Sequence, residues 1–311
     1  MGHHPPIIWL GFTAIVGALL ILDLAVLNRR SHVLSFKEAV SWSLGLIALA
    51  LLFGLFILWR EGTQPALEYY TGYLIELSLS VDNLFVFILI FSYFGVPAEA
   101  QPKVLKWGIL GAIVMRFLMI GLGALLLERF DWIIYVFGGI LILTGIRMFT
   151  QKDERIEPEK NPIVRLARRV LPFAKAYDGA SFFIRSGTGR LLATPLLLVL
   201  IVVEWSDLVF AIDSIPAIFA VTRDPFLVYS SNVFAILGLR ALFFVLAGMM
   251  DKFVYLKPGV ALILVFVGVK MTLSYWVHIP ILASLAVILL TLVTAVILSL
   301  RHARQEERLA A

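Results

Sequence analysis

Long apolar runs alternate with short polar connections along nearly the whole chain. A run of about 20 apolar residues can cross a hydrocarbon layer of ~30 Å as an α-helix. The pattern therefore predicts an all-α, polytopic membrane protein whose residues 1–311 form a single transmembrane domain. The nine expected spans cover residues 6–27, 38–59, 71–94, 104–127, 131–149, 193–219, 227–249, 258–277 and 280–300.

Composition supports a membrane protein and narrows its chemistry. Hydrophobic residues make up 61% of the chain, more than soluble domains carry. The chain has no cysteine, so disulfides and thiolate metal sites are excluded. Its five histidines lie at the termini or near predicted helix ends, which argues against a buried imidazole site. Since no nucleophile–base pair or cofactor motif is present, we expect neither an enzyme nor a permanently bound cofactor.

Positive charge is distributed very unevenly between the predicted connections. The only long polar stretch, residues 150–192, is rich in lysine and arginine. Of the 26 basic residues, 20 lie on the side of this stretch, three on the opposite side and three inside spans. Because basic residues mark cytoplasmic loops, we expect a cytoplasmic loop at 150–192, an external N-terminus and a cytoplasmic C-terminus. This topology accounts for the net charge of +5 without a nucleic-acid partner.

Two apolar segments carry acids at positions where they would lie in lipid. The first reads Glu-Leu-Ser-Leu-Ser-Val-Asp-Asn, and the second contains Glu-Trp-Ser-Asp-Leu-Val-Phe-Ala-Ile-Asp-Ser. Each contains an acid followed six residues later by an aspartate. Ionisable groups at membrane depth are costly and usually mark the path of a substrate or proton. The candidate metal ligands are Glu76, Asp82, Asn83, Glu204, Asp207, Asp213 and Ser214.

The acidic segments open two similar units, residues 71–149 and 193–277. Arg116 follows in the first unit and Arg240 in the second, within similar apolar surroundings. Three spans per unit place the second copy in the membrane upside down relative to the first. The sequence therefore predicts an inverted repeat of three helices, an arrangement that gives transporters a site at the membrane midplane.

The candidate ligands are all oxygen atoms, which suit Mg²⁺, Ca²⁺ or Mn²⁺ better than zinc or copper. Arg116 and Arg240 are expected to balance the excess negative charge. Contact with an anionic substrate and a purely structural pairing with an acid are the alternatives. The first candidates for their partners are Asp82 and Asp213. Pro216 is expected to bend or break its helix near the site.

At these residues the chain resembles the TerC family of integral membrane proteins, in particular its Alx branch. The resemblance rests on residues 76–83 and on residues 210–222, and it covers nearly the whole chain. The family is historically labelled for tellurium resistance, and the Alx branch as a redox modulator. The resemblance implies manganese export across a bacterial inner membrane and metal roles for the seven candidate ligands.

The sequence thus predicts a membrane transporter that exports divalent metal cations, with Mn²⁺ as the expected ion and proton exchange as a candidate for the coupling. The lipid bilayer and the metal ion are the expected partners. One alternative is another hard cation, or a role in tellurite resistance. Another is a non-transporting membrane scaffold that recruits partners through residues 150–192, where an amphipathic helix between residues 163 and 173 could lie on the membrane surface.

Overall fold

The chain folds into long helices that follow the expected spans. The computed structural model describes residues 4–27, 35–130, 132–150, 162–185, 190–247, 254–273, 276–277 and 279–310. Each of the nine expected ranges coincides with one long helix in these residues. The long helices are α1 (Pro6–Leu27), α2 (Phe36–Glu61), α3 (Thr63–Phe94), α4 (Gln101–Arg129), α5 (Ile133–Thr150), α7 (Pro195–Phe219), α8 (Pro225–Ala247), α9 (Leu256–Thr272) and α10 (Ile281–Ala310).

Seven helices of the described residues are long and apolar enough to cross a membrane, namely α2, α3, α4, α5, α7, α8 and α10. The described apolar part of α1 is shorter, and α9 has 17 residues. At 1.5 Å per residue, α9 spans about 26 Å, slightly less than a hydrocarbon core. The chain is therefore a polytopic helical membrane protein, and nine crossings stay a prediction.

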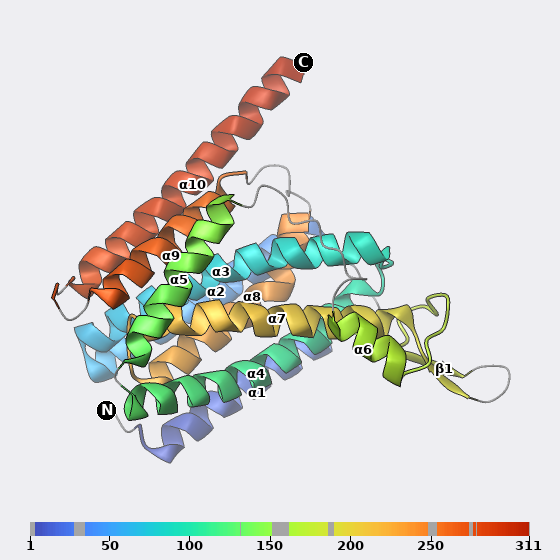
Figure 1. Cartoon of the computed structure of the whole chain (residues 1–311), viewed down its shortest axis with the longest axis horizontal. Coiled ribbons are helices and arrows are strands. Elements are labelled where there is room, and N and C mark those ends of the chain that lie inside the picture. The colour runs from blue at the N-terminus through green and yellow to red at the C-terminus, as the bar shows by residue number, and fades with distance from the viewer. Residues whose placement is uncertain are drawn as a thin grey trace.

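Helices α3, α7 and α8 lie in the middle of the molecule, with the other long helices around them (Figure 1). Helix α8 is apolar on nearly every face and is the most buried of the seven candidate spans, which is the pattern of a helix surrounded by protein. The peripheral helices expose large apolar side chains such as Trp59, Leu143 and Leu290. Exposed apolar faces of this kind are expected to contact lipid.

Glycines allow α5 and α9 to cross at close range. A Cβ added at Gly138 would lie 3.0 Å from the Gly268 carbonyl oxygen, and one added at Gly145 would lie 2.8 Å from the Ala261 carbonyl oxygen. Residue numbers rise along α5 while those of its partners fall along α9, so the two helices are antiparallel. Close approach through small residues is the usual way in which helices associate in lipid.

Helices α3 and α7 are each continuous, so Pro216 does not break its helix, and a bend at this residue stays a prediction. Pro216 lies one turn before the end of α7, and helical geometry continues through it to Phe219. The proline has no N–H to donate to the carbonyl four residues earlier, and the helix ends three residues after it. The acids on α3 and α7 are therefore arranged by regular helical geometry.

The segment between α5 and α7 is more structured than a linker. It contains a short helix, α6 (Pro162–Val170), and an antiparallel hairpin of β1 (Phe183–Arg185) and β2 (Leu191–Ala193). The expected amphipathic helix is therefore present. Its apolar face, with Val164 and Ala167, packs into a core shared with α3, α4, α7 and α8. The hairpin is a small departure from the all-α prediction.

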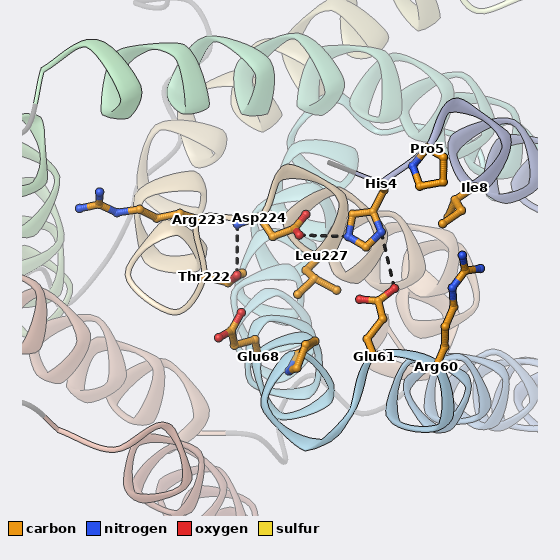
Figure 2. A pocket seen from close by; sticks show the side chains of 11 residues that line it. His4, Pro5, Ile8, Arg60, Glu61, Glu68, Thr222, Arg223, Asp224 and Leu227 are labelled. Carbon is orange, nitrogen blue, oxygen red and sulfur yellow. Dashed lines mark hydrogen bonds and ion pairs between the residues drawn. The ribbon is translucent and has the colours of Figure 1, made fainter. Parts of the chain in front are cut away.

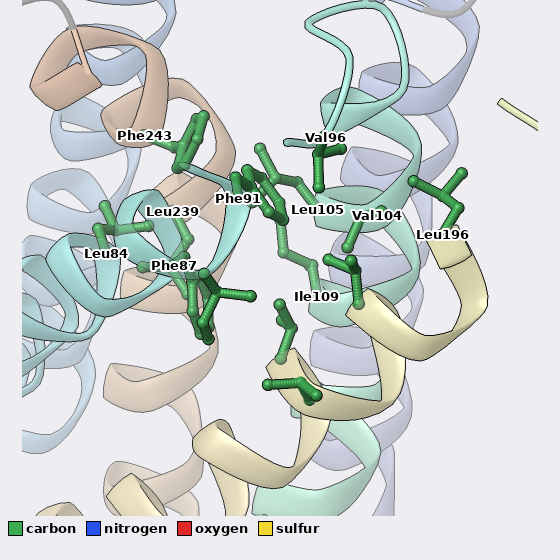
Figure 3. Close-up of a cluster of buried hydrophobic side chains, with 14 of the residues drawn as sticks. Leu84, Phe87, Phe91, Val96, Val104, Leu105, Ile109, Leu196, Leu239 and Phe243 are labelled. Atoms are coloured by element: carbon green, nitrogen blue, oxygen red, sulfur yellow. The ribbon is translucent and has the colours of Figure 1, made fainter. Parts of the chain in front are cut away.

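That core fills one end of the helical bundle with aliphatic and aromatic side chains. Figure 3 shows residues from α3, α4, α7 and α8 meeting there, among them Phe87, Ile109, Leu196 and Phe243. The Tyr177 hydroxyl ties the loop to the same end by donating to the Phe94 carbonyl at 2.8 Å. Partial burial raises the pKa of Tyr177, so the hydroxyl keeps its proton for this bond.

Candidate functional site

A buried ion pair links α3 and α4 in the middle of the bundle. Arg116 Nη1 lies 2.8 Å from Glu76 Oε1, and the two side chains are 1% and 0% exposed. The same nitrogen of Arg116 donates a hydrogen bond to the Ser214 hydroxyl on α7. Breaking such a pair from one side is expected to cost several kcal/mol, because the remaining charge stays buried. Three helices are thus joined at one charged centre.

Two further acids on α7 extend this centre. Asp207 is 4% exposed and lies close enough to Glu76 and Arg116 to interact electrostatically with both. Glu204 is one turn away from Asp207 on the same helix and is partly buried. Its carboxylate is close enough to that of Asp207 for the two to interact electrostatically. Glu76 and Asp207 therefore share the Arg116 guanidinium, with Glu204 beside Asp207, so that acids outnumber arginines among these four side chains.

A glycine on α4 makes room for one of these acids. A Cβ added at Gly111 would collide with the carboxylate of Glu204. Without a side chain at this position, α4 can pass α7 while the Glu204 carboxylate points into the interface. The structure thus shows that Gly111 accommodates an acid at this helix crossing.

Several buried oxygen atoms in this region lack a hydrogen-bond partner among the described residues. They are Oε2 of Glu76, Oγ of Ser80 and Oδ2 of Asp207. Buried polar groups are normally paired, so unpaired ones call for an explanation such as water or an ion. Their oxygen chemistry fits a hard cation, since carboxylate and hydroxyl oxygens are the ligands that such ions prefer.

The structure brings together five of the predicted site residues, because Glu76, Glu204, Asp207, Ser214 and Arg116 lie in one buried region. Asn83 is also buried on α3. The side chains of Asp82 and Asp213 lie outside the described part of the structure. Within that part, no three histidine, cysteine, aspartate or glutamate side chains form a metal-binding cluster. The seven-residue ligand set therefore stays a prediction.

Among the described side chains, Arg116 has a carboxylate partner in Glu76, one of the candidate metal ligands. The expected partner, Asp82, has its side chain outside the described part of the structure, so that pairing stays a prediction. Glu76 faces α4 because it lies on the interior stripe of α3 with Ser80 and Asn83. Arg240, the equivalent residue on α8, is 4% exposed and buried in the same bundle.

The sequence reading missed a polar run on α8. Ser230, Ser231 and Asn232 are each at most 1% exposed. The two serine hydroxyls bond to carbonyls one turn earlier in the helix, whereas both amide atoms of Asn232 lack a partner among the described residues. Three consecutive polar residues inside an apolar span were the signal that could have identified this region.

It also missed a pocket formed by the connections at the end of the bundle that carries the N-terminus. His4 lies at its centre, with Nε2 3.0 Å from Asp224 Oδ2 and Nδ1 3.5 Å from Glu61 Oε1 (Figure 2). The cavity, here called the His4 pocket, measures about 730 Å³. It is lined by His4, Pro5, Ile8, Arg60, Glu61, Pro65, Glu68, Thr222, Arg223, Asp224 and Leu227.

The bundle and its buried charges define a multi-pass integral membrane protein with a polar centre. The particular family is shown by comparison, since the chain matches the integral membrane protein TerC family over residues 61–307 and belongs to it. It is 52% identical over 301 residues to the uncharacterized membrane protein STKORF319 of Myxococcus xanthus, covering 96% of this chain and 94% of that protein.

Other relatives share the name Alx. The chain is 47% identical over 313 residues to the putative membrane-bound redox modulator Alx of Escherichia coli K12, covering 96% of this chain and 97% of the relative. The Alx protein of Photorhabdus laumondii is 44% identical over 303 residues, covering 94% of each chain. No solved structure matches the chain. The resemblance to the TerC family and its Alx branch is confirmed.

Proposed function

We propose that this protein exports hard divalent cations across a bacterial inner membrane, with Mn²⁺ as its main substrate. The observation that carries the proposal is the charge of the centre, where Glu76 pairs with Arg116, Asp207 interacts electrostatically with both, and Glu204 lies beside Asp207. With all four groups ionised, two negative charges remain, which a divalent cation would balance. Charge buried in a low-dielectric region requires such compensation.

Helix packing supports the inverted repeat that such a transporter would use. The equivalent helices of the two units pack against each other in pairs, α3 with α7, α4 with α8 and α5 with α9. In the predicted repeat, Gly145 of α5 corresponds to Gly268 of α9, so Gly138, seven residues earlier, corresponds to Ala261. The structure shows two contacts between these helices, Gly138 with Gly268 and Gly145 with Ala261. Exchanging each residue for its equivalent turns one contact into the other, as expected for two units related by a two-fold axis.

Two alternatives receive less support from the residues present. An anionic cargo such as tellurite would require free cationic groups, whereas Arg116 is already engaged by Glu76 and Ser214. The Alx relatives are named redox modulators, and thiol-based redox chemistry is not open to a chain without cysteine. A scaffold would not need carboxylates in the middle of the bundle.

Ion flux in proteoliposomes tests the proposal. Purified protein is reconstituted, and uptake of Mn²⁺, Ca²⁺, Mg²⁺ and Zn²⁺ is compared with and without a pH gradient. Asp82→Asn and Asp213→Asn are each expected to lower Mn²⁺ flux by at least ~10-fold, because each removes a negative charge from the candidate site.

The matched control is Asp178→Asn, the same substitution at an exposed loop residue, which should transport as the unmodified protein does. Flux of none of the four ions would refute the proposal. A preference for Ca²⁺ or Mg²⁺ would keep the transport and change the substrate. Dependence of Mn²⁺ flux on an opposing proton gradient would support proton exchange.

A further inference from the structure

Three helices place regular stripes of residues between the His4 pocket and the charged centre. On α3, Glu68 lines the pocket, Gly72 follows one turn later and Glu76 lies one turn beyond. Residues four apart on a helix lie on the same face, so this stripe joins the pocket to the centre. The distance along the helix between Glu68 and Glu76 is about 12 Å.

Helices α7 and α8 provide equivalent stripes. Thr222 lines the pocket and donates its backbone N–H to the Ile218 carbonyl, and Ser214 lies one turn further on, at the centre. On α8, Leu227 lines the pocket and Ser231 lies one turn deeper. The three stripes therefore run from the same cavity into the interior.

The stripes meet in a single layer of small and medium-sized side chains. A Cβ added at Gly72 would lie 3.1 Å from the Ser231 hydroxyl oxygen and 3.5 Å from Ile218 Cγ2. Gly72, Ile218 and Ser231, here called the closing layer, thus separate the pocket from Glu76. Asn232 follows Ser231 and is fully buried, with both amide atoms unpartnered among the described residues. An unpaired amide in lipid-embedded protein is costly, and passing water or ions would satisfy it.

The other end of the bundle is closed quite differently. From the centre toward α6, the space between α3, α4, α7 and α8 is filled by the large apolar core of Figure 3. Large apolar side chains also pack at the pocket end, among them Tyr69 and Phe226. Along the three stripes, however, only one residue per helix separates the lining of the pocket from the depth of Glu76.

The charges of the pocket suit a cation route. Glu61, Glu68 and Asp224 supply three carboxylates, while Arg60 and Arg223 supply two guanidinium groups, of which that of Arg223 extends away from His4 and Asp224 (Figure 2). Glu68 is held by Gln64 and lies near Lys270, so it is oriented at the pocket wall. The three carboxylates outnumber the two guanidinium groups of the lining, and an excess of acids in a cleft raises the local concentration of cations.

We propose that the His4 pocket is the outer vestibule of the divalent-cation route and that the closing layer of Gly72, Ile218 and Ser231 is its outer gate. The identity of the transported ion rests on the proposed function, whereas the path from the pocket to the centre rests on the geometry alone. Opening requires α7 or α8 to move away from α3 by enough for an ion to pass Ser231. The vestibule takes hydrated divalent cations, with carboxylates replacing part of their water.

Thiol labelling tests the path independently of the cargo, because the chain has no cysteine of its own. The variants are Glu68→Cys in the pocket, Ser231→Cys in the gate and Leu118→Cys as the control. Leu118 is 63% exposed on the outer surface of α4 and follows Phe117, whose ring lies 5.5 Å from that of Tyr229, so its depth is similar to that of Ser231. The reagent is a membrane-impermeant cationic thiosulfonate, added to intact cells.

The Glu68→Cys variant is expected to react quickly from outside. The Ser231→Cys variant should react from outside roughly 10- to 1000-fold more slowly, because it is reached only in a minor, open conformation. The Leu118→Cys variant faces lipid and should not react on this timescale. Equal, negligible labelling of Ser231→Cys and Leu118→Cys would overturn the gate. Labelling of Glu68→Cys only from the cytoplasmic side of inverted vesicles would overturn the outer assignment.

Transport measurements give a second readout. Gly72→Leu should lower Mn²⁺ flux by more than ~10-fold, since a side chain wedged against Ser231 blocks opening, while the Mn²⁺ affinity of the purified protein changes less than ~3-fold. Gly121→Leu, at an exposed glycine with no neighbour within 4 Å, is the matched control. Normal flux in Gly72→Leu would overturn the gate. If the unmodified protein moves no divalent ion, the proposed function fails, and the labelling experiment still decides the path.

Discussion

At the scale of single residues, the structure is dominated by the cost of burying charge. Glu76 and Arg116 are almost completely enclosed, and neither could remain ionised there without the other. The ion pair is the contact expected of an arginine that balances the charge of an acid, and that role stays a prediction. It also engages one of the oxygens that a cation would otherwise bind.

Removal of the Arg116 side chain is expected to destabilise the protein strongly, and a second substitution is expected to restore its stability. Arg116→Met should lower the free energy of unfolding by about 3–5 kcal/mol, because Glu76 is left as an unpaired buried acid. Adding Glu76→Gln should restore most of the loss. Thermal unfolding in detergent measures both effects, with Arg147→Met, at an exposed helix end, as the control. If neither Glu76→Gln nor Asp207→Asn restores stability, charge balance is the wrong explanation.

Gly111 gives a second prediction at this scale. Gly111→Ala should displace the Glu204 carboxylate and weaken Mn²⁺ binding, while stability changes by less than about 1 kcal/mol because the displaced group is the end of a flexible side chain. In a Glu204→Gln background the same substitution should have little further effect on binding. Calorimetric titration of the single and double variants measures this coupling. Gly121→Ala, with no neighbour within 4 Å, should bind as the unmodified protein does.

At the scale of elements, helix contacts through small residues determine how the two units fit together. Helices α5 and α9 make the closest crossing, where backbone carbonyls of one helix face glycines of the other. Helix α2 meets α3 in a related way, since the Tyr69 and Tyr70 hydroxyls donate to the carbonyls of Ala50 and Leu51. Such contacts are satisfied only in one register, so they fix the relative positions of the helices.

Substitution at the crossing is expected to be destabilising on both helices. Gly145→Ala and Gly268→Ala should each cost about 1–3 kcal/mol, because the added Cβ meets backbone atoms that cannot move away. Gly139→Ala is the control on the same helix, since nothing lies within 4 Å, and it should be neutral or stabilising by about 1 kcal/mol. Unfolding in detergent measures the three variants. Equal stability of all three would show that the crossing is not closely packed in the membrane.

At the scale of the whole molecule, the connections gather at two ends that differ in charge. The His4 pocket collects connections that the alternation of spans places outside, including the α2–α3 and α7–α8 corners. The opposite end carries α6, the hairpin and the basic residues Lys103 and Arg165. The grouping agrees with a consistent up-and-down path, and the orientation of that path in a membrane stays a prediction from the basic residues.

Labelling of single cysteines decides the orientation. Glu128→Cys, at the exposed end of α4, should react with an impermeant maleimide in intact cells, and Asp178→Cys, in the exposed loop, only after the cells are permeabilised. The physical basis is the 20-to-3 distribution of basic residues between the two sides. The reverse pattern would invert the topology and place the His4 pocket in the cytoplasm.

The sequence by itself determined the class of the protein. In lipid the backbone N–H and C=O groups of a segment must pair with each other, so a crossing segment is a helix, and it is recognised as a long apolar run. It also located the interior stripes of α3 and α7, since acids placed in such runs can only face other helices. Only the tertiary structure decided that Arg116 pairs with Glu76, that Gly111 accommodates Glu204, and that His4 meets Asp224, 220 residues away. Those contacts depend on how each helix is rotated and shifted along its neighbours. Apolar sequences allow many such arrangements of similar energy, and only close packing of the side chains selects one of them.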